Sequence, residues 1–248
     1  MYRILAVTAG LLLAVLPMLA RAQDYVVIES SVPALAVGAT LAAGAPLDLP
    51  DKARVVLLTS SGQVLAVNGP FQGPPPATTG TSEAGADDLL KIIPTLLGNA
   101  DSRQSLGAVR GTDATWRADN AKSLGDVTAI DATDGGDVCL FDGQPAELIH
   151  NPSNAGPMNI ESMSNGAKAT VTWASGALHQ SWPESLPLGD GDTILFEGGG
   201  DNATAMATIH LLPANPAASD LARAAQMADA GCDDQARLLI GVIAKSAK

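Results

Sequence analysis

Three histidines, His150, His179 and His210, are the residues of this chain best suited to acid–base or metal chemistry, but their spacing fits no ligand pattern. Neither H-x-x-H nor H-E-x-x-H occurs, the second being the pattern in which two imidazoles share one helix face and bind zinc. We interpret each histidine as a strand-surface or core-edge residue. The sequence therefore predicts no metal site and no cofactor.

Motifs of nucleophilic and nucleotide chemistry are missing as well. The chain contains no G-x-S-x-G nucleophile elbow and no P-loop lysine followed by Ser or Thr. Cys139 and Cys232 are too far apart for a C-x-x-C redox pair. Carboxylates paired for glycoside cleavage depend on a distance in space, so an enzyme whose site assembles on folding stays open as a third hypothesis. We predict that the protein is not an enzyme.

Trp173, His179 and Trp182 form the best candidate for a small-ligand site, because all three lie within ten residues. Large amphipathic rings on a strand and the following turn would suit a carbohydrate. The alternative is that Trp182 pins the turn to the core, because large aromatic side chains usually contribute through burial.

The two cysteines, Cys139 and Cys232, are expected to form a disulfide, as an exported chain favours. The loop between them would be worth about 4 kcal/mol in the chain-entropy model. The competing interpretations are two buried thiols or a metal pair. A metal pair would need further Cys or His ligands nearby.

Residues 1–22 have the features of a secretory signal peptide. Arg3 provides a positive start, Ile4–Leu19 is mostly apolar, and Ala20-Arg21-Ala22 matches the A-x-A cleavage pattern. A membrane anchor is the alternative, but the apolar run is interrupted and short of the roughly 20 residues that span a bilayer. We expect cleavage after Ala22 and a periplasmic or secreted protein, with no stable membrane insertion afterwards.

The charge of the chain restricts its partners. The formal net charge is −12, and removal of residues 1–22, which carry two arginines and no acidic residue, brings it to −14. Nucleic acids and anionic lipid surfaces bind clustered Lys and Arg, which are scattered here. We therefore expect no nucleic-acid partner, and another envelope protein as the partner.

The elements that would position these residues begin with a small β domain at residues 23–73. Tyr25–Ser30, Arg54–Thr59 and Gln63–Asn68 are strand-like, and the last two flank Ser60-Ser61-Gly62, a hairpin signal. About 50 residues bury little apolar surface on their own. We therefore expect this domain to pack against the larger β module that is predicted at residues 138–213.

Spaced glycines and alternating apolar residues make residues 26–73 similar to the FecR-type periplasmic β domain. The resemblance rests on Val37, Gly38, Leu41, Gly44, Leu47, Leu49, Ala53 to Leu58, Gly62 to Val64 and Leu65 to Pro70. It implies a domain that serves in envelope signalling or in surface and scaffold proteins, through protein contacts rather than catalysis.

Residues 74–137 are predicted to be a linker with one short helix at 87–98. Pro, Gly, Thr and Ser dominate its start, and residues 87–98 begin with two aspartates and end with glycine. This helix could dock on a partner or membrane, or cover an open face of the same protein, which its acidic flanks favour. Asp131–Asp137 has the composition of a calcium loop without its spacing, so we interpret it as a solvated turn.

Residues 138–213 are predicted to form an Ig-like β-sandwich, because short strand patterns alternate with turns. Strands are expected at Val138–Phe141, Ala146–His150, Asn159–Met163, Ala167–Trp173, Thr193–Phe196 and Ala205–Leu211. The first two flank Asp142-Gly143 and should pair as a hairpin. In the fourth strand, alternation places Val171 and Trp173 on one face.

Residues 214–248 are predicted to form a helical hairpin that packs on the sandwich. One helix starts near Ser219 and stops at Gly231, and a second covers Gln235–Lys245, with Cys232 at the turn between them.

The expected fold is therefore mainly β within the α+β class. It comprises a small antiparallel β domain, a linker with a short helix, an Ig-like sandwich and a C-terminal helical hairpin. The expected function is that of an exported bacterial envelope protein that acts through protein contacts, as a scaffold or signalling accessory. A carbohydrate- or small-ligand-binding protein that uses Trp173 and Trp182 is the alternative.

Overall fold

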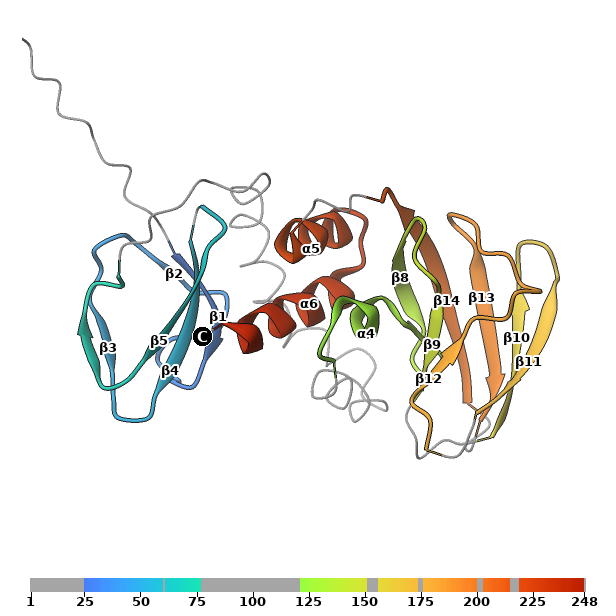
Figure 1. Ribbon diagram of the computed structural model, residues 1–248, viewed down its shortest axis with the longest axis horizontal. Helices are drawn as coiled ribbons and strands as arrows, with labels where there is room; N and C mark the ends of the chain where they lie inside the picture. Colours follow the sequence, from blue (N-terminus) through green and yellow to red (C-terminus); the bar gives the residue numbers. More distant parts are fainter. Residues whose placement is uncertain are drawn as a thin grey trace, which may run out of the picture.

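The computed structural model describes residues 25–59, 61–76, 121–150, 156–173, 176–199, 203–214 and 219–247. They form three blocks, in which a layer of helices lies between a small β domain and a β-sandwich (Figure 1). The predicted class, mainly β with a C-terminal helical pair, is confirmed. The expected signal peptide and the expected helix at 87–98 lie outside the described residues.

The small β domain has a four-stranded sheet in the order β2-β1-β4-β5 and a two-stranded sheet of β3 and β6. Its strands are β1 (Tyr25–Ser30), β2 (Thr40–Leu41), β3 (Leu47–Leu49), β4 (Arg54–Thr59), β5 (Val64–Asn68) and β6 (Phe71–Gly73). The predicted β4–β5 hairpin is confirmed, with Leu58 opposite Val64. Gly62 has a φ of 81° in the turn, a left-handed conformation that favours glycine.

Strands β1 and β4 are buried on both faces, which explains why they read as continuous apolar runs. One face packs inside the β domain through Tyr25, Val27, Val55 and Leu57. The other face packs on the helix layer through Val26, Ile28, Val56 and Leu58. The small domain thus packs against the helices. Among the described residues, the helix layer is what buries the face formed by Val26, Ile28, Val56 and Leu58.

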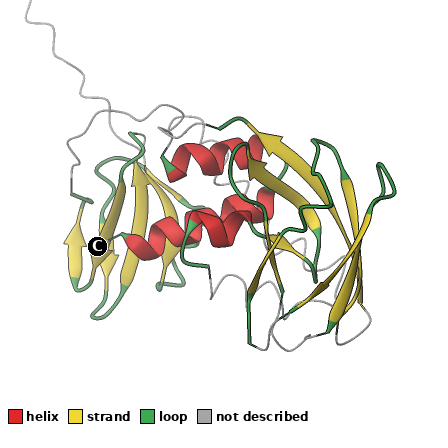
Figure 2. Ribbon diagram, turned by 45° about the vertical axis from the view of Figure 1, so that its right-hand side comes forward, coloured by secondary structure: helices red, strands yellow, loops and turns green. Residues whose placement is uncertain are grey.

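The helix layer contains α5 (Asp220–Asp229) and α6 (Asp233–Ser246), as the sequence predicted. The Ser219 hydroxyl caps α5 by accepting a hydrogen bond from the Ala222 N–H at 3.2 Å. Gly231, with a φ of 86°, lies in the turn between the helices. Figure 2 shows the two helices between the two β blocks.

Arg54 of β4 fastens the far end of α6 to the small β domain. Its Nη2 donates hydrogen bonds to the carbonyl oxygens of Ala244 at 3.2 Å and Ala247 at 2.7 Å. The last carbonyls of a helix lack intrahelical partners and carry partial negative charge, so a cation there is stabilising.

The β-sandwich consists of a five-stranded sheet, β11-β10-β13-β14-β8, and a three-stranded sheet, β12-β9-β7. Its strands are β7 (Ile130–Asp131), β8 (Gly136–Phe141), β9 (Glu147–Ile149), β10 (Pro157–Ser162), β11 (Lys168–Thr172), β12 (His179–Ser181), β13 (Thr193–Gly198) and β14 (Ala203–Leu212). Both sheets contribute to one buried core, which includes Ile130, Leu148, Ile160, Trp173 and Phe196.

The predicted hairpin between Val138–Phe141 and Ala146–His150 is wrong. β8 pairs in parallel with β14, whereas β9 pairs antiparallel with β12 and in parallel with β7. The Asp142-Gly143 turn therefore carries the chain from one sheet to the other. From Val138 to Phe141, both faces of β8 are buried, because Val138 faces the sandwich core and Cys139 faces the helices.

The predicted linker also extends too far, because residues 121–137 belong to the folded core. They form α4 (Leu124–Thr128), β7 and the start of β8. A capping box between Ser123 and Asp126 starts α4. Their glycines and aspartates suggested a solvated loop, but Val127, Ala129, Ile130 and Ala132 are all buried. Short apolar runs of this kind gain their order from tertiary contacts rather than from local propensity.

The predicted disulfide is confirmed, since Cys139 of β8 is bonded to Cys232 at the α5–α6 turn. Next to it, the buried side chain of Gln235 joins three elements. Its Oε1 accepts a hydrogen bond from the Cys139 N–H at 2.6 Å, and its Nε2 donates to the Val127 oxygen at 2.9 Å. Within the described ranges, no helix has the length and apolar character needed to cross a membrane.

Candidate functional site

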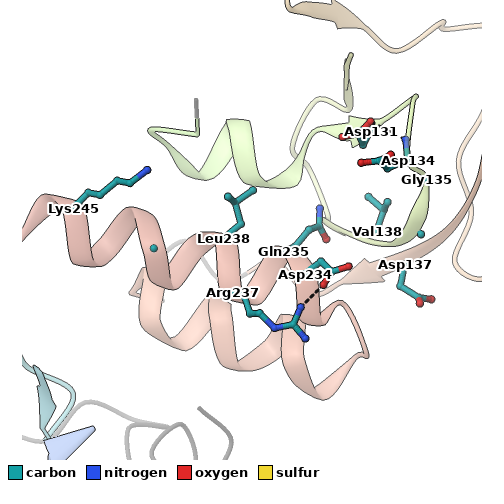
Figure 3. A pocket seen from close by; sticks show the side chains of 12 residues that line it. Asp131, Asp134, Gly135, Asp137, Val138, Asp234, Gln235, Arg237, Leu238 and Lys245 are labelled. Carbon is teal, nitrogen blue, oxygen red and sulfur yellow. Dashed lines mark hydrogen bonds and ion pairs between the residues drawn. The ribbon is translucent and has the colours of Figure 1, made fainter. Parts of the chain in front are cut away.

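A groove lies between α6 and the turn that joins β7 to β8 (Figure 3). Its volume is about 390 Å³, which falls in the usual range of ligand pockets, roughly 300–1,000 Å³. The turn side is formed by Asp131, Asp134, Gly135, Gly136, Asp137 and Val138, and the helix side by Asp234, Gln235, Arg237, Leu238, Gly241 and Lys245.

One end of the groove is negatively charged, its middle is apolar, and its other end is positively charged. Carboxylates of the β7–β8 turn gather at one end, near the start of α6. Leu238 lies in the middle, and Lys245 extends from α6 at the far end from Asp131 and Asp134 (Figure 3). A ligand lying along α6 would therefore meet negative charge, apolar surface and positive charge in turn.

The turn side of the groove is held rigidly. The carboxylate of Asp131, only 4% exposed, accepts hydrogen bonds from the N–H groups of Thr133 at 2.9 Å and Asp134 at 3.1 Å. Gly135 has a φ of 68°, and a Cβ there would lie 2.1 Å from the Met206 oxygen of β14. The turn thus presses against the neighbouring strand, and only glycine fits at this position.

The helix side is open because α6 contains a glycine. A Cβ added at Gly241 would meet no atom within 4 Å, so the missing side chain leaves space in the groove. Glycine inside a helix costs about 1 kcal/mol relative to alanine. Near the start of the helix, Arg237 forms an ion pair with Asp234.

Sequence reasoning missed this groove. Asp131–Asp137 was interpreted as a solvated turn, and the helix at Gln235–Lys245 was expected only to pack on the sandwich. One local signal existed, namely Gly241 within a predicted helix. The approach of the turn to the helix depends on the disulfide and on Gln235, and neither contact can be read from spacing.

The predicted platform of Trp173, His179 and Trp182 does not form. Trp173 is only 7% exposed and belongs to the sandwich core. Its ring lies against that of the buried His150, with ring centres 3.9 Å apart. A ring enclosed in this way has no face for a sugar, so the proposed site loses its main residue.

Trp182 is half-buried and packs against the same core. Its Nε1–H donates a hydrogen bond to the Leu186 oxygen at 2.6 Å, which closes the turn that follows β12. This matches the alternative stated for Trp182, in which the indole holds the following turn against the core.

His179 lies between two carboxylates that come from different elements. Its Nε2 is 3.2 Å from Asp126 Oδ1 of α4, and its Nδ1 is 3.1 Å from Glu147 Oε2 of β9. The carboxylates meet opposite nitrogens of the ring, so the three groups do not converge on one ion. Among the described residues, no group of three or more His, Cys, Asp or Glu side chains has a geometry that could hold a metal.

Asp126 also completes the cap of α4. Burial acts to raise the pKa of this carboxyl, but hydrogen bonds from the Lys122 N–H and from the Ser123 hydroxyl and N–H outweigh burial. Together with the nearby His179, they hold the pKa of Asp126 below the ordinary value. The arrangement ties α4 to β9 and β12, and we interpret it as structural.

His210 is the third histidine, and it lies on β14 with its Nε2 3.0 Å from Asp137 Oδ1. Asp137 belongs to the groove, so this contact links the exposed face of the five-stranded sheet to the groove's acidic end.

Comparison of this chain with family models, with curated proteins and with solved structures finds no match.

Proposed function

We propose that this protein is an exported, non-catalytic binding protein of the bacterial envelope that acts through contacts with another protein. The observation that carries the proposal is the groove between α6 and the β7–β8 turn, with its apolar middle and charged ends. Pockets that recognise ligands typically combine apolar surface with a few placed polar groups.

The walls of the groove support a binding role because they are preorganised. Helix α6 is held at its start by the Cys139–Cys232 disulfide and by Gln235, and at its end by Arg54. A wall that is already ordered loses little conformational entropy when a partner binds, which favours affinity. The resemblance of residues 26–73 to FecR-type domains is a second, independent support, since such domains work through protein contacts.

The proposal can be tested by cross-linking the protein, purified after export, to envelope extracts of the producing bacterium. Gly241→Leu should fill the groove, whereas Gly241→Ala adds one methyl group and serves as the matched control, because both replace the helix glycine. We expect one or more proteins to be captured by the wild type and Gly241→Ala, and lost with Gly241→Leu.

Recovery of the same proteins with all three variants would contradict a role of the groove. Recovery of no protein above the background of an unrelated exported protein would contradict the binding function itself. Circular dichroism of each variant checks that the fold is retained.

A further inference from the structure

We propose that the outer edge of the five-stranded sheet, strand β11, is a self-association surface on which a second copy of this chain lays its own β11 in the antiparallel direction. The two five-stranded sheets would then join into one continuous sheet across a two-fold axis at Thr170. This edge is separate from the groove, so the inference goes beyond the function proposed above, and either proposal can fail alone.

Strand β11 ends the sheet, because it pairs with β10 and with no other strand among the described residues. Figure 1 shows it at the outer end of the sandwich, away from the helix layer. A strand in this position presents a row of backbone N–H and C=O groups to which a further strand can bind. The opposite edge of the sheet differs, because Gln235 accepts the hydrogen bond of the Cys139 N–H there.

The register between β10 and β11 identifies the outward backbone groups. The Ser162 N–H donates to the Ala167 oxygen, and in antiparallel strands the pairs that exchange hydrogen bonds alternate with pairs that do not. By this alternation, Ala169 and Val171 bond to β10. The intervening residues direct their N–H and C=O groups outward, and they are Lys168, Thr170 and Thr172. Within the described ranges, no hydrogen bond joins these outward groups to another element.

Strand β11 lacks most of the features that keep edge strands from pairing. It contains no proline, and its register with β10 has no bulge. Its one charged residue, Lys168, lies at the first position, and the Lys168 Nζ is 2.7 Å from Glu161 Oε2 of β10. The ammonium group is thereby held on the face of its own sheet. Thr170 and Thr172 are short, so they leave the backbone of the edge accessible.

Charge is compatible with contact between two copies at this edge. The chain has a formal net charge of −12, so two copies repel each other in general. Residues 156–173 form β10, β11 and the turn between them, and they contain one acidic and one basic residue, Glu161 and Lys168. Two acidic molecules can therefore approach each other at this edge with little local repulsion.

Strand β11 is also complementary to itself. In the antiparallel register centred on Thr170, that residue faces its own copy, and Lys168 faces Thr172 of the second copy. Each of these facing pairs can exchange two hydrogen bonds, so every outward group obtains a partner. Facing threonines are favourable, and no two charges of the same sign are opposed. Because the same patch serves both copies, the interface closes as a dimer.

The association should be weak and should depend on concentration. Two five-residue strands cover less surface than the roughly 1,200–2,000 Å² of a stable interface. Sedimentation equilibrium of the protein purified after export, in about 0.15 M salt to screen its net charge, measures the monomer–dimer equilibrium. We expect a rising share of dimer between about 10 μM and about 0.5 mM. A monomer over this whole range would overturn the inference.

Thr170→Pro tests the edge itself. The Thr170 N–H points outward, so proline removes hydrogen bonds of the dimer and leaves the bonds between β11 and β10 in place. Thr170→Ala is the matched control, because it loses the same side-chain contact with Asn159 but keeps the N–H. We expect proline to weaken dimerisation about tenfold or more, and alanine to weaken it less than about threefold. Equal dimerisation of the two variants would contradict pairing through this edge.

Thr172 offers a second test that leaves the backbone unchanged. Thr172→Lys would oppose Lys168 of the second copy at both ends of the interface and should weaken dimerisation about three- to tenfold. Thr172→Glu should maintain or strengthen it. Overall repulsion predicts the opposite order, because lysine makes each copy less acidic and glutamate makes it more acidic. No difference between the two variants, or the opposite order, would overturn the inference.

Two controls separate this edge from the other proposals. Circular dichroism checks the fold of each variant, and if Thr170→Pro unfolds, the comparison of the two Thr172 variants decides. Gly241→Leu leaves β11 unchanged and should not alter the dimer. A different protein could instead add an extended strand to this edge. If the wild type stays monomeric and envelope proteins are captured with Thr170→Ala but not with Thr170→Pro, the edge belongs to such a partner and self-association is excluded.

Discussion

Gln235 Oε1 accepts a hydrogen bond from the Cys139 N–H at 2.6 Å, close to the disulfide that joins the same strand to the same helical turn. β8 is the last strand of the five-stranded sheet, so this N–H bonds to a side chain instead of to a further strand. The side-chain amide of Gln235 thereby closes the sheet edge and fixes the start of α6, which forms one wall of the groove.

Replacing Gln235 by alanine should lower the free energy of unfolding by about 2–4 kcal/mol. The change leaves the buried Cys139 N–H without this acceptor, which costs about 1–3 kcal/mol, and removes the hydrogen bond to the Val127 oxygen, which is worth about 0.5–1.5 kcal/mol. Urea denaturation measures the loss. Gln144→Ala, at an exposed position, should change stability by less than about 0.5 kcal/mol. Equal losses of stability in the two variants would show that the contacts of the Gln235 amide do not contribute to the free energy of unfolding.

Replacing Cys139 and Cys232 together by alanine should lower stability by about 4 kcal/mol. The cysteines are separated by 93 positions, and closing a loop of that length restricts the unfolded chain. Both cysteines are fully buried, so alanine avoids introducing a polar group. Urea denaturation of the variant and of the wild type with and without reductant checks this expectation. A loss below about 1 kcal/mol in both comparisons would contradict it.

Arg54→Ala should lower stability by about 1–2 kcal/mol and expose the last turn of α6 to hydrogen exchange. The variant removes hydrogen bonds to the Ala244 and Ala247 oxygens at a helix C-terminus. Glu29→Gln is the control, because it removes the ion pair to Arg54 and leaves the helix contacts in place. An exposed pair of this kind contributes about 0–1 kcal/mol. Unchanged exchange in the last turn of α6 would argue against the proposed role of Arg54.

The stability that depends on Asp126 should disappear at low pH. Its pKa in the folded protein is lowered from 3.8, so the ionised carboxylate stabilises the fold above about pH 4. That contribution is lost as the pH falls through the lowered pKa. At pH 7, Asp126→Ala should therefore be less stable than wild type by about 1 kcal/mol, as for a lost helix cap.

The difference between Asp126→Ala and wild type should shrink as the pH falls from about 4 to about 2. Glu147→Gln alters the other side of His179 without touching the cap, so it should not reproduce this pH profile. A difference that stays constant over the whole range would mean that the charge of Asp126 is not what stabilises α4.

Much of the local structure could be predicted because its signals are local. β1 and β4 lie at the predicted residues, and the pattern of Lys168–Thr172 placed Val171 on the buried face. Ser219 caps α5 as the sequence indicated. Strand periodicity and helix caps depend on neighbours a few residues apart, so one sequence suffices to recognise them.

Pairing between strands was predicted for the β4–β5 hairpin, but the predicted pairing of β8 with β9 is wrong. The residues Asp142-Gly143 favour a tight turn, and a tight turn can join two strands of one hairpin or lead from one sheet to another. Whether a hairpin or a crossing forms depends on which parts of the protein cover the two faces of β8. Val138 faces the sandwich core and Cys139 faces the helices, and that choice involves segments about 70 to 100 residues away.

The sequence by itself indicated that the fold is mainly β, placed strands such as β1 and β4 and the two C-terminal helices, and favoured pairing of the two cysteines. Tertiary structure alone decided that Trp173 is enclosed, that residues 121–137 belong to the core, and that the β7–β8 turn meets α6 across a groove. The reason is physical: a side chain's type limits what it can contact, but its burial depends on surfaces that are brought together only when distant segments pack.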